Sequence, residues 1–466
     1  MNSTQTVAQA LAGFLCQLQY EQLPSEIVLW QKALLLDQLG CQLLGSTLDW
    51  NRPVYNFVRE NKSGGPASIV NFGEKAALDD AVLVNGTFGQ GCELDDYYDQ
   101  GGGHPGAASI PVALAMSEKH LITGKQLLAA VAAGYEIGWR VGRALLPELM
   151  RRGYHAQGVV GVFIAAATAA KLLHLNPEKM THALAIAGSH ASGTMEYDQS
   201  GGEVKRMHNG MACSAGVRSA MLAAMGLTGP PTIFEGTRGI LKVFSGACNT
   251  EPLLKGLGSD FAVRHAAIKR FPVNASQHSP IELLANMIER YDIRVADVKS
   301  IEVGVNEGII LHGGTIFEPT EVIEAQFSLR FSLALRLLKH SNDFGLYLNP
   351  KLWSDPAILA VGKKVTLVAD SSAQAERRFA CRMKIALNSG KVIDGELAAP
   401  KGTVGNPLSK DETTAKFFTM ASAALPDQEL RKIVEKVDNV ETEGNMSSLV
   451  KLMMVKRNVG ERQKES

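Results

Sequence analysis

The segment that decides the fold is residues 158–173, which reads GVVGVFIAAATAAKLL. Its residues are almost uniformly small and apolar, so a helix formed here is expected to be buried on all sides. We therefore place it at the centre of a helical bundle. Flanking stretches carry apolar residues at three- and four-residue spacing. They predict further helices at 25–44, 109–120, 123–146, 179–191 and 209–225.

The pattern changes near residue 264. Four later segments alternate or run apolar with β-branched residues, which is typical of strands. These segments are 298–304, 364–369, 378–387 and 391–396. The turn sequence Asn388-Ser389-Gly390 between the last two predicts a hairpin. Helical patterns between the strands, at 280–291 and 326–338, make this part a smaller α+β unit.

Helical patterns return after this unit, at 410–420 and 427–437. The fold class we predict is mainly α, with a large all-helical domain and a smaller α+β lid domain. The helical domain would comprise residues 1–266 and 404–455, the lid domain 267–403, and a solvated tail 456–466.

Composition narrows the class of protein. The chain has 466 residues, 45% of them hydrophobic and 20% charged, which excludes a disordered or fibrous protein. Lys and Arg total 47, and Asp and Glu total 47, so the net charge is zero. A nucleic-acid-binding protein usually carries a basic surplus, so we predict no nucleic-acid partner.

Sequence also bears on location. The longest apolar run covers residues 159–170 and ends at Lys171, shorter than the ~20 residues that a bilayer requires. The N-terminus has no basic leader followed by an apolar segment. The six cysteines are scattered, without a C-x-x-C pair, and are interpreted as reduced thiols. We therefore predict a cytoplasmic protein with no membrane contact.

Polar residues within small, apolar segments are the candidates for chemistry. Glu93, Asp95 and Asp96 precede a glycine run that ends at His104, and glycine backbone freedom can bring this histidine to a pocket wall. The alternative is a solvated acidic loop. His155 lies at the start of the central apolar helix, where it is either a general acid or base, or a satisfied cap.

Two further segments supply cations. Lys205, Arg206 and His208 lie just before a small-residue helix, and a solvated basic turn is the alternative interpretation. Lys269 lies near the predicted domain boundary, where clefts tend to form, and is followed by Asn274 and His278. A basic linker contact is the alternative there. Cations from separate segments of a neutral chain indicate a small anionic ligand.

The common signatures of nucleotide, metal and serine-hydrolase sites are absent from the sequence. There is no Walker loop, no G-x-S-x-G, no H-E-x-x-H and no close cluster of His and Cys. We therefore predict no bound metal.

Five blocks in register resemble the 2-methylcitrate dehydratase and cis-aconitate decarboxylase family, MmgE/PrpD, which also includes iminodisuccinate epimerase. The blocks are ELDDYYDQGGGHPGAASIPVALAMSE, GYHAQGVVGVFIAAATAAKLL, SGTMEYDQSGGEVKRMHNGMACSAG, LTGPPTIFEGTRG and KRFPVNASQH. The resemblance covers about residues 5 to 450. It implies a homodimer of two-domain chains, with the site between the domains and no metal or organic cofactor.

The resemblance also assigns residues and an activity. The family's active-site positions fall on Glu93, His104, His155, Lys205 and Lys269. The substrate-binding neighbours in the same blocks are Asp95, Asp96, Arg206, His208, Asn274 and His278. The implied activity is a lyase, a dehydratase or decarboxylase of a small di- or tricarboxylate. The alternatives are an epimerase of a dicarboxylate such as iminodisuccinate, and a non-catalytic carboxylate-binding protein.

The proposed chemistry follows from one difficulty. Moving a proton at a carbon next to a carboxylate places extra negative charge on that group, and fixed cations stabilise it. Lys205 and Lys269, with Arg206, are the predicted cations, and His104 and His155 the predicted acid and base. Glu93 or Asp95 would orient one imidazole.

Overall fold

A computed structural model describes residues 5–61, 64–98, 100–307, 309–310, 314–370 and 379–454 of the chain. It divides into two compact units, which are described separately. Unit 1 contains residues up to Met195, Val204–Arg264 and the chain from Ser409 onward; unit 2 contains Glu196–Glu203 and His265–Leu408. The predicted tail at 456–466 lies outside the described residues.

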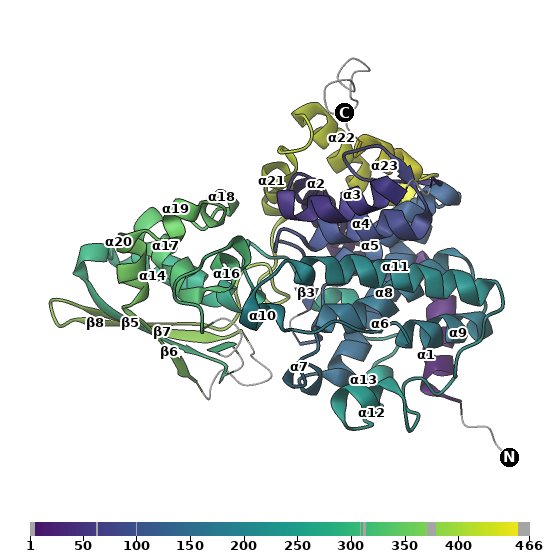
Figure 1. Cartoon of the computed structure of the whole chain (residues 1–466), viewed down its shortest axis with the longest axis horizontal. Helices are drawn as coiled ribbons and strands as arrows, with labels where there is room; N and C mark the ends of the chain where they lie inside the picture. Colours follow the sequence, from purple (N-terminus) through teal and green to yellow (C-terminus); the bar gives the residue numbers. More distant parts are fainter. Residues whose placement is uncertain are drawn as a thin grey trace. The chain divides into compact units, whose positions relative to one another are not determined.

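Unit 1 is built almost entirely of helices, in agreement with the predicted fold class (Figure 1). Its N-terminal helices are α1 (Val7–Gln17), α2 (Ser25–Gly45), α3 (Arg52–Asn61), α4 (Leu78–Gln90), α5 (Pro105–Lys119), α6 (Gly124–Leu145), α7 (Glu148–Arg151) and α8 (Ala156–Leu172). They are followed by α9 (Pro177–Gly188), α11 (Val204–Ala224), α12 (Ile240–Ser245), α13 (Glu251–Leu254), α21 (Lys410–Ala421), α22 (Asp427–Asp438) and α23 (Ser447–Leu452). Short strands β1 (Ala67–Ser68) and β2 (Lys75–Ala76) pair with each other, and β3 (Tyr97–Tyr98) follows α4.

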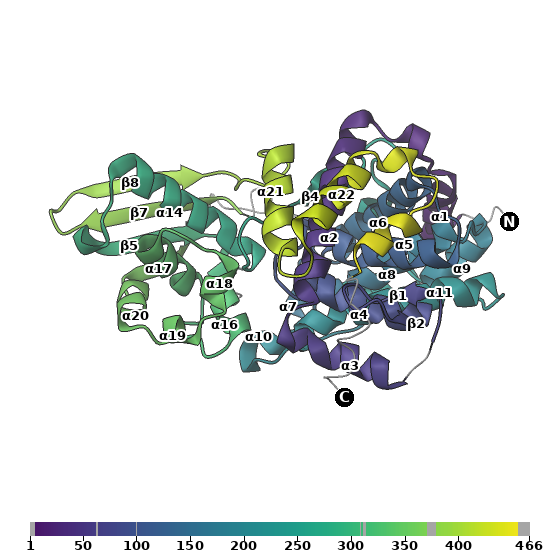
Figure 2. The ribbon, with the colours of Figure 1, turned by 90° about the horizontal axis from the view of Figure 1, so that it is seen from above.

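Helix α8 lies at the centre of unit 1, as its sequence predicts. Its residues are buried apart from Lys171, and it packs against α5, α6, α9 and α11. The C-terminal helices α21 and α22 return to pack on α2, as Figure 2 shows from above. Because α8 is buried on every face, its sequence has small apolar residues all round and no polar stripe.

Helix starts are set by local caps. Thr123 caps α6 and forms a capping box with Gln126, and Ser409 does the same for α21 with Glu412. In each box two backbone N–H groups of the first turn donate to side-chain oxygens. These caps explain why α6 and α21 begin within one residue of the predicted position.

Two helices, α5 and α11, begin four and five residues earlier than predicted. α5 starts at Pro105, with His104 as its N-cap residue, so Pro111 lies inside the helix and not in its first turn. α11 starts at Val204, so Lys205, Arg206 and His208 belong to its first turns and do not precede it. The first turn of α11 carries site residues whose partners are far away in the sequence.

Unit 2 is the α+β part. Its helices are α10 (Tyr197–Ser200), α14 (His278–Tyr291), α16 (Val322–Phe327), α17 (Leu329–Lys339), α18 (Phe344–Tyr347), α19 (Pro350–Trp353) and α20 (Pro356–Gly362). Its strands are β4 (Ala266–Ala267), β5 (Val298–Val305), β6 (Val365–Ala369), β7 (Cys381–Leu387) and β8 (Val392–Leu397).

Four of these strands form one sheet in the order β6-β5-β7-β8. β5 and β6 are parallel, whereas β7 is antiparallel to both β5 and β8. The hairpin predicted at 388–390 therefore joins β7 to β8. Cys381, Met383 and Ile385 are buried while Arg382 and Lys384 are exposed, so only one face of the sheet is covered. Figure 1 shows α14 and α17 on that face.

The glycine run before His104 packs closely against helix α6 of unit 1. A Cβ atom at Gly142 in α6 would overlap the carbonyl oxygen of Gly101. We expect Gly142→Ala to destabilise the protein by about 1–3 kcal/mol, because helix and loop cannot both keep their positions. Gly13→Ala in α1 is the matched control, since no atom lies within 4 Å of its Cβ and alanine is expected to favour the helix. Urea unfolding of both variants checks this, and equal unfolding midpoints would contradict it.

Among the helices in the described ranges, none combines the length and the hydropathy that a bilayer crossing needs.

Candidate functional site

The predicted residues of unit 1 come from four places in the chain. Glu93, Asp95 and Asp96 follow α4. His104 and His155 are the N-cap residues of α5 and α8. Lys205, Arg206 and His208 lie in the first turns of α11. The structure connects these four places through the contacts described next.

Glu93 and Lys205 form a buried ion pair. Their side chains are 2% and 4% exposed, and Lys205 Nζ donates to Glu93 Oε1. Glu93 has a φ of 58°, in the left-handed region that a non-glycine residue rarely occupies. A buried charge of either sign is costly without its partner, so removing one member of the pair is expected to destabilise the other.

The segment that carries Glu93 is held from two sides. Arg206 Nη1 donates to Gly91 O at 2.6 Å, and its guanidinium lies 4.6 Å from the centre of the Trp50 ring. Lys416 in α21 donates to Leu94 O at 2.7 Å and pairs with the buried Asp37. Arg206 is only 1% exposed and serves the loop backbone through this contact.

His104 is oriented by the acidic segment. Its Nδ1 lies 2.9 Å from Asp95 Oδ2 and 3.0 Å from Asp96 O. Both neighbours are acceptors, so Nδ1 carries a proton and Nε2 is the nitrogen that can accept or deliver one. Gly102 and Gly103 have φ angles of 61° and 86°, which place the chain for this contact.

Two residues that sequence reasoning missed hold His104 from the other side. Gln157, in the first turn of α8, accepts from the backbone N of His104 at 2.6 Å. Its amide donates to Asn209 Oδ1 at 2.5 Å, and Asn209 in turn donates to Gly86 O and Ala107 O. Both residues lie within the sequence blocks that resemble the family. The feature that could have identified them is a polar amide side chain in a helix of small, apolar residues.

Asp96 is completely enclosed by the protein. It accepts from the Tyr135 hydroxyl at 2.6 Å and from the backbone N of Gly106 at 2.9 Å, at the start of α5. Burial, with the nearby charges of Asp95 and Asp37, raises the pKa of Asp96 to about 7, although the Tyr135 hydrogen bond and His104 oppose this. Burial also raises the pKa of Tyr135 well above its usual value, so Tyr135 remains a donor.

The raised pKa of Asp96 predicts a pH-dependent stability. Between pH 4 and 7 the folded state keeps a proton that the unfolded state has lost, so stability falls as pH rises through this window, by up to ~1.4 kcal/mol per pH unit. Asp96→Asn removes this dependence, so its free energy of unfolding relative to the native protein should increase from pH 5 to 7. Asp49→Asn, at a side chain that is 94% exposed, is the control. Urea titrations at three pH values test it, and parallel pH profiles for native protein and Asp96→Asn would refute it.

His155 and His208 contact each other directly. Their Nδ1 atoms are 2.9 Å apart, and their ring centres are 5.1 Å apart. The backbone N of His155 donates to Gly193 O at 3.0 Å, which fixes the residue at the start of α8. Burial, and then the positive charge of Lys205, lower the pKa of His208. His208, which contacts His155, is therefore neutral at pH 7.

The remaining predicted residues belong to unit 2. Lys269 is 1% exposed, and its neighbour Ile268 donates from its backbone N to Gly402 O. The Asn274 side chain accepts from Ser276 N at 3.0 Å and from Ser276 Oγ at 2.7 Å, as the cap of a short helical turn. His278 starts α14 and lies 5.4 Å from the Phe271 ring.

The arrangement in unit 1 is suited to acid–base chemistry beside a fixed cation. It contains one carboxylate-oriented imidazole, one pair of imidazoles and one buried lysine. No group of three or more His, Cys, Asp or Glu side chains that could hold a metal occurs within the described part of the chain.

Comparison with known proteins identifies the class. Residues 9–252 match the MmgE/PrpD N-terminal domain, and residues 271–440 match the MmgE/PrpD C-terminal domain. Together these matches cover most of the chain, which therefore belongs to the MmgE/PrpD family. The family predicted from the five sequence blocks is confirmed.

Curated relatives are similar over almost their whole length. A cis-aconitate decarboxylase-like protein, oryM, of Aspergillus oryzae is 27% identical over 96% of this chain and 97% of its own. Cis-aconitate decarboxylase of Aspergillus terreus is 26% identical over 97% of this chain and 96% of its own. The human cis-aconitate decarboxylase is 24% identical over 97% of this chain and 94% of its own.

Proposed function

We propose that the protein is a lyase that acts on a small di- or tricarboxylate without an organic or metal cofactor. The reaction would transfer a proton at a carbon next to a carboxylate. The observation that carries the proposal is a set of contacts in unit 1 that links the segments carrying His104, His155 and Lys205 to the starts of α8 and α11. Relatives named as cis-aconitate decarboxylases support the same class.

Each group has a part in the proposed reaction. Lys205, fixed by Glu93, stabilises the negative charge that develops on the substrate carboxylate. Lys269 of unit 2 is proposed as a second cation, and Asn274 and His278 as its neighbours in substrate recognition. Arg206 holds the Glu93 segment and adds positive charge to this part of unit 1.

His104 and His155 are the proposed acid and base. The contacts of His104 leave Nε2 as its reactive nitrogen, and Asp95 stabilises the imidazolium that forms when this nitrogen accepts a proton. Asp96 supports this pair by fixing the start of α5 through Gly106. Two independent imidazoles also suit an epimerase, which removes a proton from one face of a carbon and returns one to the other. Epimerisation is therefore the second candidate.

One experiment distinguishes these functions. The purified protein is incubated in D₂O with cis-aconitate, citrate, 2-methylcitrate and iminodisuccinate, and each mixture is followed by NMR. A lyase yields a new product, by loss of CO₂ or water, and an epimerase yields deuterium exchange with inversion only. Binding of a carboxylate without exchange or product would support the non-catalytic alternative. Neither binding nor conversion of any of the four would contradict the proposal.

The homodimer and the cytoplasmic location implied by the resemblance stay predictions. Light scattering of the purified protein and fractionation of the cells that produce it test them.

A further inference from the structure

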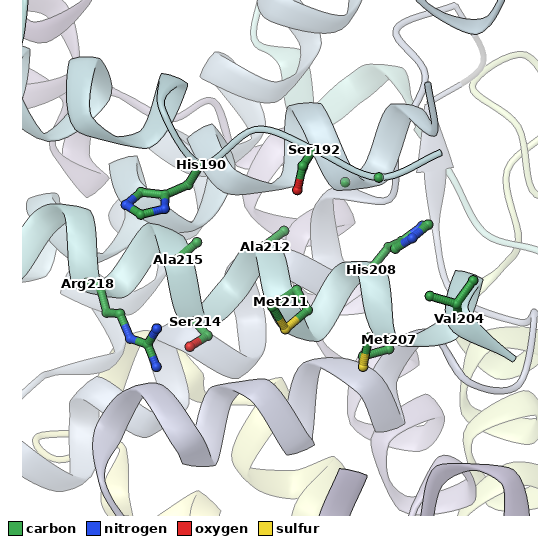
Figure 3. Close-up of a pocket in the computed structure, with 12 residues that line it drawn as sticks. His190, Ser192, Val204, Met207, His208, Met211, Ala212, Ser214, Ala215 and Arg218 are labelled. Carbon is green, nitrogen blue, oxygen red and sulfur yellow. The ribbon is translucent and has the colours of Figure 1, made fainter. Parts of the chain in front are cut away.

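A groove runs along the outer side of α11 in unit 1. Its volume is about 370 Å³, and Met211, Ala215 and Arg218 are among the residues that line it. His208 lies toward one end of the groove and His190 toward the other, as Figure 3 shows. His208 therefore both lines the groove and contacts His155.

The contact between the two histidines requires a single shared proton. Two Nδ1 atoms at 2.9 Å form a hydrogen bond only when one carries hydrogen and the other presents a lone pair. In one arrangement His155 Nδ1–H donates to His208, and Nε2 of His155 holds the lone pair. In the other arrangement His208 donates, and His155 carries its hydrogen on Nε2.

Burial and the surrounding charges favour a neutral ring at His208. Lys205 lies one turn before His208 on α11 and lowers its pKa, in addition to the effect of burial. The other charged or titratable groups of the groove are His190 and Arg218, and Arg218 is paired with Asp79. A full imidazolium next to Lys205 is therefore costly, whereas exchange between two neutral arrangements is not.

We propose that His208 is a positioning residue that relays protons between solvent in the groove and His155. The proposal rests on the function assigned to His155 above. It gives His208 a different part from the substrate contact predicted from sequence, because His208 acts through His155.

The relay conserves protons in both directions. When His155 Nε2 takes a proton from a substrate carbon, its Nδ1 proton passes to His208 Nδ1, and the Nε2 proton of His208 leaves to water. In reverse, a proton from water arrives at His208 Nε2, the Nδ1 proton passes back to His155, and His155 Nε2 delivers a proton to the carbon. Both rings are neutral before and after each passage. Loss of CO₂ leaves an electron pair on carbon that consumes one such proton, which solvent must replace.

The test compares His208→Gln with His190→Gln, which changes a histidine at the far end of the same groove. Glutamine can donate a hydrogen bond to His155 but cannot pass a proton on. We expect kcat of His208→Gln to fall on the order of 10²-fold with little change in KM, and added imidazole to restore the rate in proportion to its concentration. His190→Gln and the native protein should show neither effect.

Three outcomes decide the proposal. Native kcat in His208→Gln, or a lowered kcat that imidazole does not restore, would overturn the relay while leaving the proposed function intact. Failure of the native protein to convert any of the four carboxylates would count against the function instead. In that case ¹⁵N NMR of the histidines in the native protein still tests whether His208 is neutral and shares a hydrogen with His155. An imidazolium at His208 at pH 7, or no shared hydrogen between the Nδ1 atoms, would refute it.

Discussion

Replacing His155 by alanine is expected to lower kcat by about 10²- to 10⁴-fold while the protein stays folded. The backbone N of His155 donates to Gly193 O, and its carbonyl accepts from Val159 N at the start of α8. Alanine keeps both contacts. The imidazole is what is lost, and with it the proposed acid–base group and its contact with His208.

The measurement is an initial rate with the carboxylate that the four-substrate experiment identifies, together with a thermal melt. His190→Ala is the control, because it removes an exposed histidine from the same unit. A native rate in His155→Ala would remove this residue from the mechanism. A large drop in melting temperature would show that the side chain is needed for folding.

Lys205→Met is expected to have the largest effect on stability, with a loss of roughly 3–5 kcal/mol, because it leaves the buried carboxylate of Glu93 without its cation. Methionine has a similar length, so packing changes little. Activity should also be lost, since Lys205 is the proposed cation beside the reacting carboxylate.

The double variant Glu93→Gln/Lys205→Met separates the two effects. Its neutral side chains remove the unpaired charge, so most of the lost stability should return. Activity should not return. Urea unfolding and initial rates of both variants test this. A double variant as unstable as Lys205→Met would show that the ion pair is not the cause, and an active double variant would show that Lys205 is dispensable.

The helical core could be predicted because its signals are local. Apolar spacing defines α2, the Thr123 cap defines the start of α6, and a run of small residues defines α8. Each of these signals lies within a single stretch of chain. The β7–β8 hairpin is likewise defined by alternation on each side of a short turn. These elements agree with their predicted positions to within a few residues.

The start of α11 could not be predicted because its partners are distant in sequence. Lys205, Arg206 and His208 look like a solvated basic turn until Glu93, Gly91 O and His155 are known to face them. With those partners, a first turn that carries three polar groups can be buried. Gln157 escaped notice for the same reason, because its role depends on the backbone of His104.

The site residues predicted in unit 1 stay a prediction, but the structure shows contacts of these side chains that the sequence does not reveal. Sequence alone could not tell that Asp96 is bound by Tyr135 or that Arg206 serves a backbone carbonyl, since both facts depend on tertiary contacts. The sequence blocks give the types of the site residues. The buried contacts determine which of their atoms are left to bind or react with a substrate.

One helix, α11, carries both Lys205 and His208, three positions apart. The rise between them is about 4.5 Å along the helix axis, and neither can move without the other. In the proposed mechanism Lys205 stabilises the substrate carboxylate and His208 supports His155, so a shift of α11 during evolutionary divergence would disturb both functions. Changes of specificity are therefore expected in the loops, while this helix is inherited as an unaltered unit.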